Sequence, residues 1–483
     1  MRAATILMAA PAQDPYHRGL SLLHGWVVPT VEVVAAVILI LAIGWRTRRW
    51  RFVWVPVGIG VGVAAVAAAH WYMDSQGMAG EPAPQRLWIW IGLSGLAVAV
   101  LLLGWTSARW WRRGVSLLAI PLCLVSAGLA LNLWVGYFPT VQAAWNHLTA
   151  GPLPDETDMA TVTAMKATGT VPSKGAVVPV AIPDTASGFK HRTELVYLPP
   201  AWFARGAPKL PTVMMIGGEF NTPGDWLRTG NAISTIDGFA AAHAGNAPVL
   251  VFVDSGGSFN NDTECVNGPR GNVADHLTKD VVPYLSSTFG VSPASANWGI
   301  VGWSMGGTCA VDLTVMHPDL FSSFVDIAGD MGPTAGTKEQ TISRLFGGDA
   351  GAWAAFDPTT VIERHGPYAG VSGWFAISGD PPTPHRGNPA NDDAVGLHGR
   401  DAGMNPGDQT QAANTLCALG RSDGIACMVV AAPGKHDWPF ATQVFATSLP
   451  WLAGQLGTPG APKVALPNWT PPPAQAPTPV STH

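Results

Sequence analysis

The stretch "NWGIVGWSMGGTCAVDL", residues 297–313, gives the first strong indication of fold and chemistry. The apolar residues before Ser304 predict a buried strand, and the residues after it follow a helical pattern. Gly302, Ser304 and Gly306 fit G-x-S-x-G, a sharp strand-to-helix turn that presents the serine above the edge of a sheet. We therefore predict that Ser304 is a nucleophile and that the N–H of Met305, at the start of the helix, stabilises an oxyanion.

A serine needs a base, and in this kind of fold the base follows the last strand of the sheet. The segment "VVAAPGKHDWPF" supplies His436 in a loop between a predicted strand and a predicted helix. We expect His436 to take the proton of Ser304 and to deliver it to the leaving group.

The third member of such a site should be a carboxylate after the penultimate strand, which we assign to "GWFAIS". Asp380 follows this strand directly, and Asp401 lies in the long polar, glycine-rich insertion that comes next. The residues alone do not choose between these two. The other acids of the insertion are expected to be solvated: Asp392, Asp393 and Asp408.

A second oxyanion donor is expected from the loop after an earlier strand, "MMIGGEFNTPGDW". The small Gly217 and Gly218 allow the backbone to approach a substrate closely. The N–H of Glu219 or of Phe220 is the predicted donor, and one such donor contributes roughly 10²–10³ in rate.

The segment from 176 to 456 alternates between predicted strands and helices. Its opening segments, "VVPVAIP" and "TELVYLP", predict a hairpin, and the later apolar runs predict buried parallel strands. Alternation of this kind predicts an α/β fold, a doubly wound sheet with helices on both faces. The segment 458–483 contains eight prolines and almost no charge, and we expect it to be a disordered tail.

The first third of the chain predicts four transmembrane helices. Charged residues make up only 12 % of the chain, against about 25 % in typical soluble domains. Each apolar run is near the ~20 residues that span a bilayer. The four runs are 27–45, 52–70, 87–105 and 115–134.

Loop charges predict how these helices are oriented. The loops after the first and third runs are rich in arginine, whereas the loop after the second has two acids and one arginine. Arginine-rich loops face the cytoplasm. The N-terminus does not resemble a removable signal peptide. We therefore expect both ends of the anchor, and everything after about residue 138, on the extracytoplasmic side of the inner membrane.

Four cysteines outside the anchor fit this location, because disulfides persist on the oxidising side of a membrane. They allow three pairings, and four free thiols remain an alternative. Cys417–Cys427, a helix end and the next strand, form an easy pair, and Cys265–Cys309 would complete it. The fifth cysteine, Cys123, lies in the fourth run.

The motifs together resemble a known family, the esterase D-type serine α/β-hydrolases, and within it the secreted mycolyltransferases of mycobacteria. The resemblance covers about 190–456 and rests on "MMIGGEFNTPGDW", "VLVFVDSGGSFNNDTEC", "GWSMGGTCAVDLTVMHPDLFSSFVDIAG" and "GKHDW". It implies that Ser304 is the nucleophile, His436 the base, and the amides of Met305 and Glu219 the oxyanion donors. The family's acid is a glutamate well downstream of the penultimate strand, which favours Asp401 over Asp380. This chain has no glutamate in that loop.

The predicted organisation has five parts: an N-terminal segment (1–26), a four-span transmembrane domain (27–138), a linker with the first strand (139–189), an α/β-hydrolase domain (190–457) and the proline-rich tail (458–483).

The predicted function is ester hydrolysis or acyl transfer on cell-envelope lipids or glycolipids through an acyl-enzyme. The acyl donor would be a lipid or glycolipid, and the acceptor water or a sugar hydroxyl. No cofactor is expected, and no metal, since H-E-x-x-H and zinc-type cysteine spacings are absent from the sequence. The net charge of −5 argues against a nucleic-acid partner. The alternative is a non-catalytic membrane-anchored module that binds lipid or glycan or acts as a scaffold.

Overall fold

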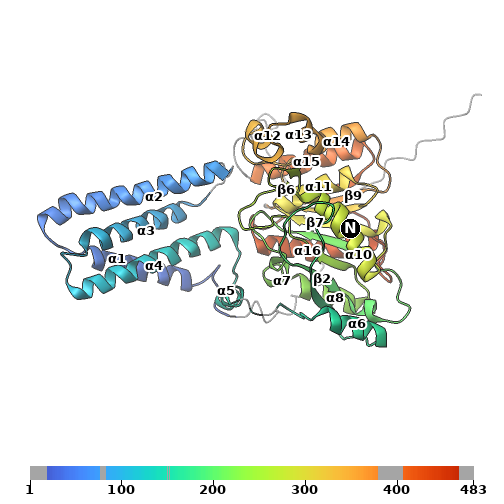
Figure 1. Cartoon of the computed structure of the whole chain (residues 1–483), viewed down its shortest axis with the longest axis horizontal. Helices are drawn as coiled ribbons and strands as arrows, with labels where there is room; N and C mark the ends of the chain where they lie inside the picture. The colour runs from blue at the N-terminus through green and yellow to red at the C-terminus, as the bar shows by residue number, and fades with distance from the viewer. Residues whose placement is uncertain (1–18, 77–82, 150, 152, 379–405, 467–483) are drawn as a thin grey trace, which may run out of the picture.

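The computed structural model describes residues 19–76, 83–149, 151, 153–378 and 406–466. An elongated helical bundle leads into a globular part (Figure 1). The bundle consists of α1 (Val27–Ile43), α2 (Val55–Gln76, continuing a π-helical turn at Trp50–Trp54), α3 (Gln85–Gly104) and α4 (Trp110–Val135).

Three helical segments of the bundle are long and apolar enough to cross a membrane: Trp50–Ser75, Gln85–Gly104 and Trp110–Val135. The remaining helix, α1, is apolar but has only 17 residues. The helices α2 and α3 pack closely through glycines, because a Cβ on Gly62 would lie 2.5 Å from the carbonyl oxygen of Gly92.

The globular part is built on one eight-stranded sheet in the order β1-β2-β4-β3-β7-β8-β9-β10. β1 and β2 form the predicted antiparallel hairpin, β2 pairs antiparallel with β4, and all later pairs are parallel. The strands are β1 (Ala176–Val180), β2 (Glu194–Leu198), β3 (Thr212–Ile216), β4 (Val249–Phe252), β7 (Trp298–Trp303), β8 (Ser323–Ile327), β9 (Ser372–Ser378) and β10 (Ala426–Ala432). The α/β fold predicted from the sequence is confirmed.

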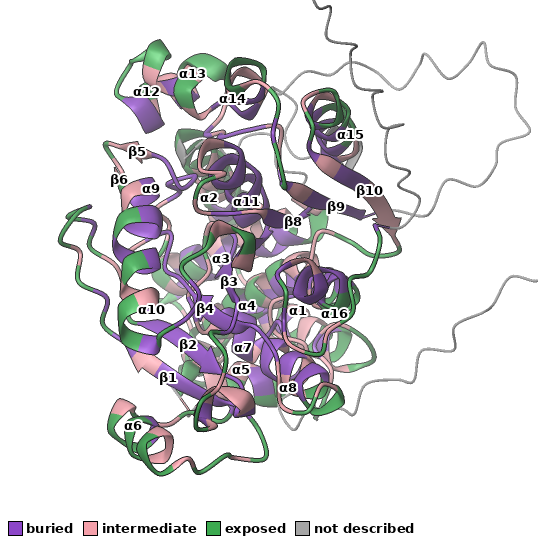
Figure 2. Ribbon diagram, turned by 90° about the vertical axis from the view of Figure 1, so that its right-hand side faces the viewer, coloured by how far each residue is buried: buried purple, intermediate pink, exposed green. Residues whose placement is uncertain are grey.

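A hydrophobic core lies on each face of this sheet. The buried residues are purple in Figure 2. One face is covered by a continuous helical stretch that runs from α9 (Val273–Asp275) through a π-helical turn (His276–Val281) to α10 (Val282–Phe289), and by α11 (Met305–Met316), α14 (Pro358–His365) and α15 (Pro406–Ser422). The other face is covered by α7 (Asp225–Arg228), α8 (Ala232–Ala242) and α16 (Trp438–Gln455).

The remaining elements lie around these layers. They are α5 (Val141–Leu148), α6 (Met159–Thr168), α12 (Lys338–Phe346), α13 (Ala350–Phe356), the short pair β5 (Asn267–Gly268) and β6 (Gly271–Asn272), and 3₁₀ turns at Pro200–Phe203 and Ser295–Asn297. Of the helices outside the bundle, only those near 273–289, 305–316, 409–420 and 439–456 were predicted. The helices not predicted are α5, α6, α7, α8, α12, α13 and α14.

Two disulfides link elements that surround the sheet. Cys265–Cys309 joins the loop after β4 to α11, and Cys417–Cys427 joins α15 to β10. This is the pairing that the sequence favoured among three. Cys123 is free and buried in α4.

The carboxyl-end loops of the sheet lie next to the ends of the helices of the bundle. Asn260, in the loop after β4, donates a hydrogen bond to the hydroxyl of Tyr72 on α2 (2.7 Å). A Cβ on Gly136, which caps α4, would lie 2.8 Å from Cβ of Asp437, in the loop after β10. The edge of the sheet that carries the candidate site therefore faces the bundle (Figure 1).

Candidate active site

Ser304 lies in a strained turn between β7 and α11. Its backbone angles, φ 59° and ψ −123°, fall in a region that L residues rarely adopt. The Ser304 amide donates to the carbonyl of Ile327 on β8 (2.9 Å), and its own carbonyl accepts from Gly307 (2.7 Å). Hydrogen bonds to β8 on one side and to α11 on the other therefore fix the conformation of the turn.

The two glycines of the motif are required by close backbone contacts. A Cβ on Gly302 would lie 1.6 Å from the carbonyl oxygen of Gly306. A Cβ on Gly306 would lie 2.4 Å from the carbonyl oxygen of Ile216, at the end of β3. No side chain fits at either position without moving the strand or the helix.

His436 reaches Ser304 from the loop after β10. Its Nε2 lies 2.9 Å from Oγ of Ser304, so the structure brings together the predicted nucleophile and the predicted base. The ring is partly buried and packs beside Trp303, with ring centroids 5.5 Å apart. Loss of solvent lowers the pKa of His436 to about 4, so the ring is neutral and able to accept a proton at physiological pH.

The Nδ1 atom of His436 faces Gln409, whose Nε2 lies 3.0 Å away. Gln409 lies in the first turn of α15 and is 2 % exposed. An amide group turned by 180° would present its oxygen to Nδ1–H, which leaves the Nε2 lone pair for the serine proton. Gln409 was not among the predicted site residues, because the partner of such a base is usually a carboxylate. Its position in the helix before the last strand was the available signal.

The predicted acids, Asp380 and Asp401, lie outside the described residues, as do Asp392 and Asp393. The choice between Asp380 and Asp401 therefore stays a prediction.

The predicted oxyanion donors come from two backbone segments that meet at Ser304. Met305 is the first residue of α11, where N–H groups have no acceptor within their own helix. The loop after β3 also approaches the serine, since a Cβ on Gly218 would lie 3.4 Å from Cβ of Ser304. The amide of Gly218 itself donates to Oδ1 of Asn221 (2.7 Å), so the second donor stays a prediction at Glu219 or Phe220.

An ion pair holds this loop in place. Arg192 donates to the carbonyl oxygen of Asn221 (2.8 Å) and binds the buried Asp254 through Nε (3.0 Å) and Nη2 (2.6 Å). Burial opposes ionisation of Asp254, but the hydrogen bonds from Arg192 outweigh it and lower the pKa of the carboxyl. The sequence analysis missed this pair, because its members come from separate segments.

Another carboxyl lies beneath the turn. Asp326 is a residue of β8, and its side chain is buried against α11. Its Oδ1 accepts a hydrogen bond from the amide of Gly329 (2.8 Å). Burial raises the pKa of Asp326 to about 7. A Cβ on Gly307 would lie 2.3 Å from Oδ1 of Asp326, so this side chain packs closely against the first turn of α11.

Comparison with known proteins supports an esterase-type domain. Residues 189–384 match the family model Esterase, described as "Putative esterase". A protein of Corynebacterium glutamicum is 30 % identical over 280 residues, which are 57 % of this chain and 60 % of that protein. The diacylglycerol acyltransferase/mycolyltransferase Ag85A of Mycobacterium ulcerans is 37 % identical over 81 residues, 17 % of this chain and 23 % of that protein. The chain thus spans less than two thirds of the length of either relative.

Solved structures with similar folds include an S-formylglutathione hydrolase of Agrobacterium tumefaciens and MPT51 of Mycobacterium tuberculosis. The first has 16 % sequence identity and a TM-score of 0.45, covering 59 % of this chain and 97 % of that chain. The second has 19 % identity and a TM-score of 0.38, covering 57 % of this chain and 97 % of that chain.

Proposed function

We propose that this protein is a membrane-anchored serine ester hydrolase or acyltransferase that acts on acyl esters of cell-envelope lipids or glycolipids. The observation that carries the proposal is the contact between Ser304 and His436, made at a strained turn whose glycines exclude any side chain. Storing backbone strain at one serine is typical of a site that serves chemistry. The acyl-transfer activity named for the M. ulcerans relative is of the same class.

In the proposed mechanism, Ser304 attacks the carbonyl carbon of an acyl ester while His436 Nε2 takes its proton. The amide of Met305 and that of Glu219 or Phe220 stabilise the oxyanion. The intermediate collapses, His436 protonates the leaving alcohol, and an acyl-enzyme remains. Water or a sugar hydroxyl then attacks this ester as His436 removes its proton, and His436 returns that proton to Oγ of Ser304 as the acyl group leaves. Gln409, or one of Asp401 and Asp380, orients the ring of His436.

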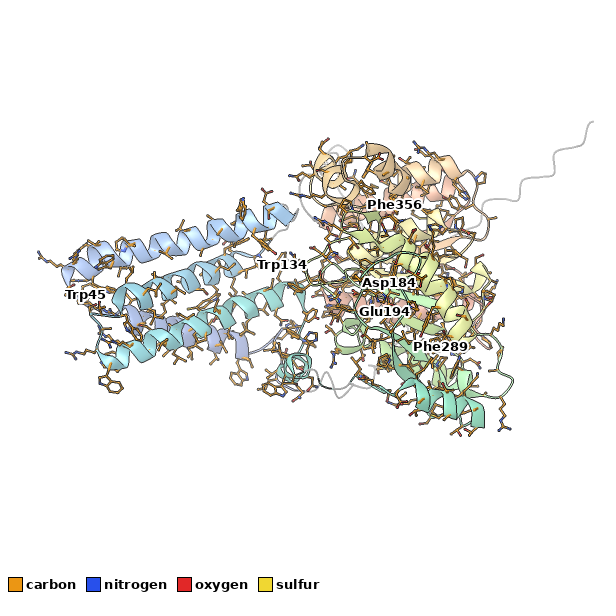
Figure 3. The ribbon with its side chains drawn as sticks, viewed as in Figure 1. Trp45, Trp134, Asp184, Glu194, Phe289 and Phe356 are labelled. Atoms are coloured by element: carbon orange, nitrogen blue, oxygen red, sulfur yellow. A yellow bond between two sulfur atoms is a disulfide. The ribbon has the colours of Figure 1, made fainter. Side chains whose placement is uncertain are left out.

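Anchoring is proposed through α1 together with the three longer apolar helices. The arginine-rich loops lie at the same end of the bundle, because Arg46 in the first donates to the carbonyl of Gly104 at the end of α3 (3.3 Å). Figure 3 labels Trp45 at the end farthest from the globular part and Trp134 at the near end. With arginine-rich loops in the cytoplasm, the globular part is extracytoplasmic. The two disulfides fit this side.

A lipid donor is favoured by the position of the candidate site beside the bundle. The loops after β4 and β10 contact the ends of α2 and α4, so Ser304 would open near the bilayer surface. Two aromatic side chains lie exposed nearby, Phe259 in the loop after β4 (75 % exposed) and Phe220 in the loop after β3 (38 % exposed), with ring centroids 5.5 Å apart. Phe220 follows the predicted oxyanion donor directly. We propose that this pair guides an acyl chain from the bilayer to the serine.

The test is acyl release and transfer by the purified full-length protein in lipid nanodiscs. Long-chain and acetyl esters of the same alcohol are compared, each with and without a sugar acceptor, and Ser304→Ala is the blank. We expect turnover that favours the long chain, and a Phe220→Ser/Phe259→Ser variant that loses this preference while it keeps the acetyl ester. If the protein hydrolyses only the acetyl ester, a long-chain lipid is not its substrate. No turnover of either ester would contradict the enzyme itself.

A further inference from the structure

A second polar cluster lies inside the globular part, away from Ser304. It consists of His191, just before β2, Glu194, the first residue of β2, and His276, the first residue of the π-helical turn after α9. Glu194 and His276 are fully buried, and the side chain of His191 is 9 % exposed. Figure 3 labels Glu194 in the interior of the globular part.

The ligand atoms of these three side chains converge. His276 Nε2 lies 3.1 Å from Oε1 of Glu194, and His191 Nδ1 lies 3.8 Å from Oε2. All three atoms lie within 4.8 Å of one another. A tetrahedral zinc ion with ligands at ~2.0–2.1 Å separates them by about 3.3 Å, which these distances bracket.

The outer nitrogen of each histidine already has a partner. Nε2 of His191 lies 2.9 Å from the carbonyl oxygen of Ile182, and Nδ1 of His276 lies 3.4 Å from the carboxylate of Asp280. Metal-binding histidines are held in this way, with one N–H donated to a carbonyl or a carboxylate and the other nitrogen facing the ion. Here the inner nitrogens lie against the carbonyl oxygen of Arg192 and the carboxylate of Glu194, and a bound ion would replace these two hydrogen bonds. Asp280 is itself fixed by the amide of Ala186 (2.8 Å).

The charge of Glu194 also requires a counter-ion. Its Oε1 accepts from the amide of Asp254 (3.1 Å), but among the described residues its buried Oε2 has no hydrogen-bond partner. A carboxylate withdrawn from water in this way is costly unless a cation compensates it.

We propose that His191, Glu194 and His276 bind one divalent transition-metal ion, with Zn²⁺ the best match to two imidazoles and a carboxylate. The carbonyl oxygen of Arg192, 2.9 Å from His191 Nδ1, is available as a further ligand. No sequence motif indicates the site, because its ligands come from two distant segments.

The site connects to the candidate active site through four hydrogen bonds. Glu194 accepts from the amide of Asp254, Asp254 holds Arg192, Arg192 donates to the carbonyl of Asn221, and Asn221 accepts from Gly218 beside Ser304. A metal ion that fixes Glu194 would therefore stabilise the loop that carries the predicted oxyanion donor. Its role would be structural, since the three ligands are buried and none of them is hydrogen-bonded to Ser304.

The rival account is that protons hold the cluster. Both ring nitrogens of His276 face carboxylates, and both ring nitrogens of His191 face carbonyl oxygens, so two imidazolium ions would also satisfy these contacts. A metal and these protons exclude each other, because a metal-binding imidazole is neutral at the ligating nitrogen.

The experiment uses the full-length protein in detergent, stripped with a chelator and dialysed against excess Zn²⁺ or Co²⁺. We expect one ion per chain by elemental analysis, a visible Co²⁺ absorption band typical of tetrahedral coordination, and a thermal midpoint that falls reversibly on chelation. Glu194→Gln and His276→Gln should lose the ion, whereas the matched control His365→Gln, at an exposed histidine on α14, should keep it.

Two results would overturn the proposal. One is a wild-type protein that takes up no ion and shows no Co²⁺ band, which assigns the cluster to protons. The other is binding that survives both substitutions, which assigns the ion to another place. If the variants do not fold, the Co²⁺ spectrum, the stoichiometry and the reversible chelation of the wild type still decide. None of these measurements depends on turnover, so failure of the proposed enzyme activity is a separate outcome.

Discussion

At the scale of single residues, backbone contacts explain why the motif around Ser304 takes the form it does. The amino-acid pattern G-x-S-x-G is short enough to occur by chance. The structure supplies the physical reason for each glycine, since Gly302 contacts the helix backbone and Gly306 contacts the end of β3. Ser304, between these two glycines, has a positive φ of 59°.

The first prediction concerns Gly306→Ala. The new Cβ would lie 2.4 Å from the carbonyl oxygen of Ile216, so we expect a loss of stability of about 1–3 kcal/mol and loss of activity as the turn shifts. Thermal unfolding followed by circular dichroism measures the first effect. The control is Gly238→Ala in α8, where nothing lies within 4 Å and stability should stay or rise. A Gly306→Ala protein with the midpoint and activity of the wild type would contradict the assigned geometry.

The second prediction concerns the protonation of His436. A ring with a pKa of about 4 is neutral above that pH, so kcat/KM should fall only as the pH drops through about 4 rather than through the ordinary value near 6.5.

Gln409→Ala should lower kcat/KM by roughly 10²-fold, because the ring loses the partner of Nδ1. Two results together would contradict this: an acidic limb of the kcat/KM profile at or above pH 6.5, and a larger loss of kcat/KM in Asp401→Asn or Asp380→Asn than in Gln409→Ala. The partner of the His436 ring would then be a carboxylate.

At the scale of elements, two disulfides cross-link the fold, one between the loop after β4 and α11 and the other between α15 and β10. The bond Cys265–Cys309 closes a separation of 44 residues and Cys417–Cys427 one of 10. By loop entropy, replacing both cysteines of a pair with serine should cost roughly 4 kcal/mol for the first bond and roughly 3 kcal/mol for the second.

Thermal unfolding of the two double-serine variants, with and without a reductant, measures this prediction. Each variant should be less stable than the oxidised wild type, and the Cys265→Ser/Cys309→Ser protein should be the less stable of the two. Unchanged midpoints for both variants would mean that neither disulfide forms in the purified protein.

Much of the element order could be predicted from the sequence, and the failures have physical causes. The buried strands, α11 and the β1–β2 hairpin follow from apolar runs and turn residues. The helices α12 (nine residues) and α13 (seven residues) were missed because they are short, although Thr337 and Gln340 form a capping box at the start of α12 that the sequence offered as a signal. Gln409 and the Arg192–Asp254 pair were missed because their partners are distant in sequence. The insertion that carries Asp380 and Asp401 has no regular sequence pattern, so the sequence does not indicate which of the two contacts His436.

At the scale of the whole molecule, the proposal depends on which side of the membrane the globular part occupies. We predict that a cysteine at Glu339, exposed on α12, reacts with an impermeant maleimide in intact spheroplasts. A cysteine at Ser107, in the loop between α3 and α4, should react only after permeabilisation, because we propose that this arginine-rich loop faces the cytoplasm. Protected Glu339→Cys together with reactive Ser107→Cys would reverse the orientation.

The contacts between the bundle and the globular part give this topology a functional meaning. The edge of the sheet that carries Ser304 and His436 lies against the ends of α2 and α4 rather than facing away from them. A soluble donor would not need this arrangement, whereas a donor embedded in the bilayer would reach the serine over a short distance. The anchor is thus proposed as part of substrate access.

The central claim is that His436 activates Ser304 as a nucleophile, and labelling with a fluorophosphonate probe tests it most directly. The full-length protein is purified in detergent and compared with Ser304→Ala and His436→Ala, each first shown to be folded by its thermal transition. The account predicts rapid covalent labelling of the wild type, none of Ser304→Ala and little of His436→Ala. A folded wild type that does not react, or labelling that persists without Ser304, would contradict the account and favour a non-catalytic lipid- or glycan-binding module.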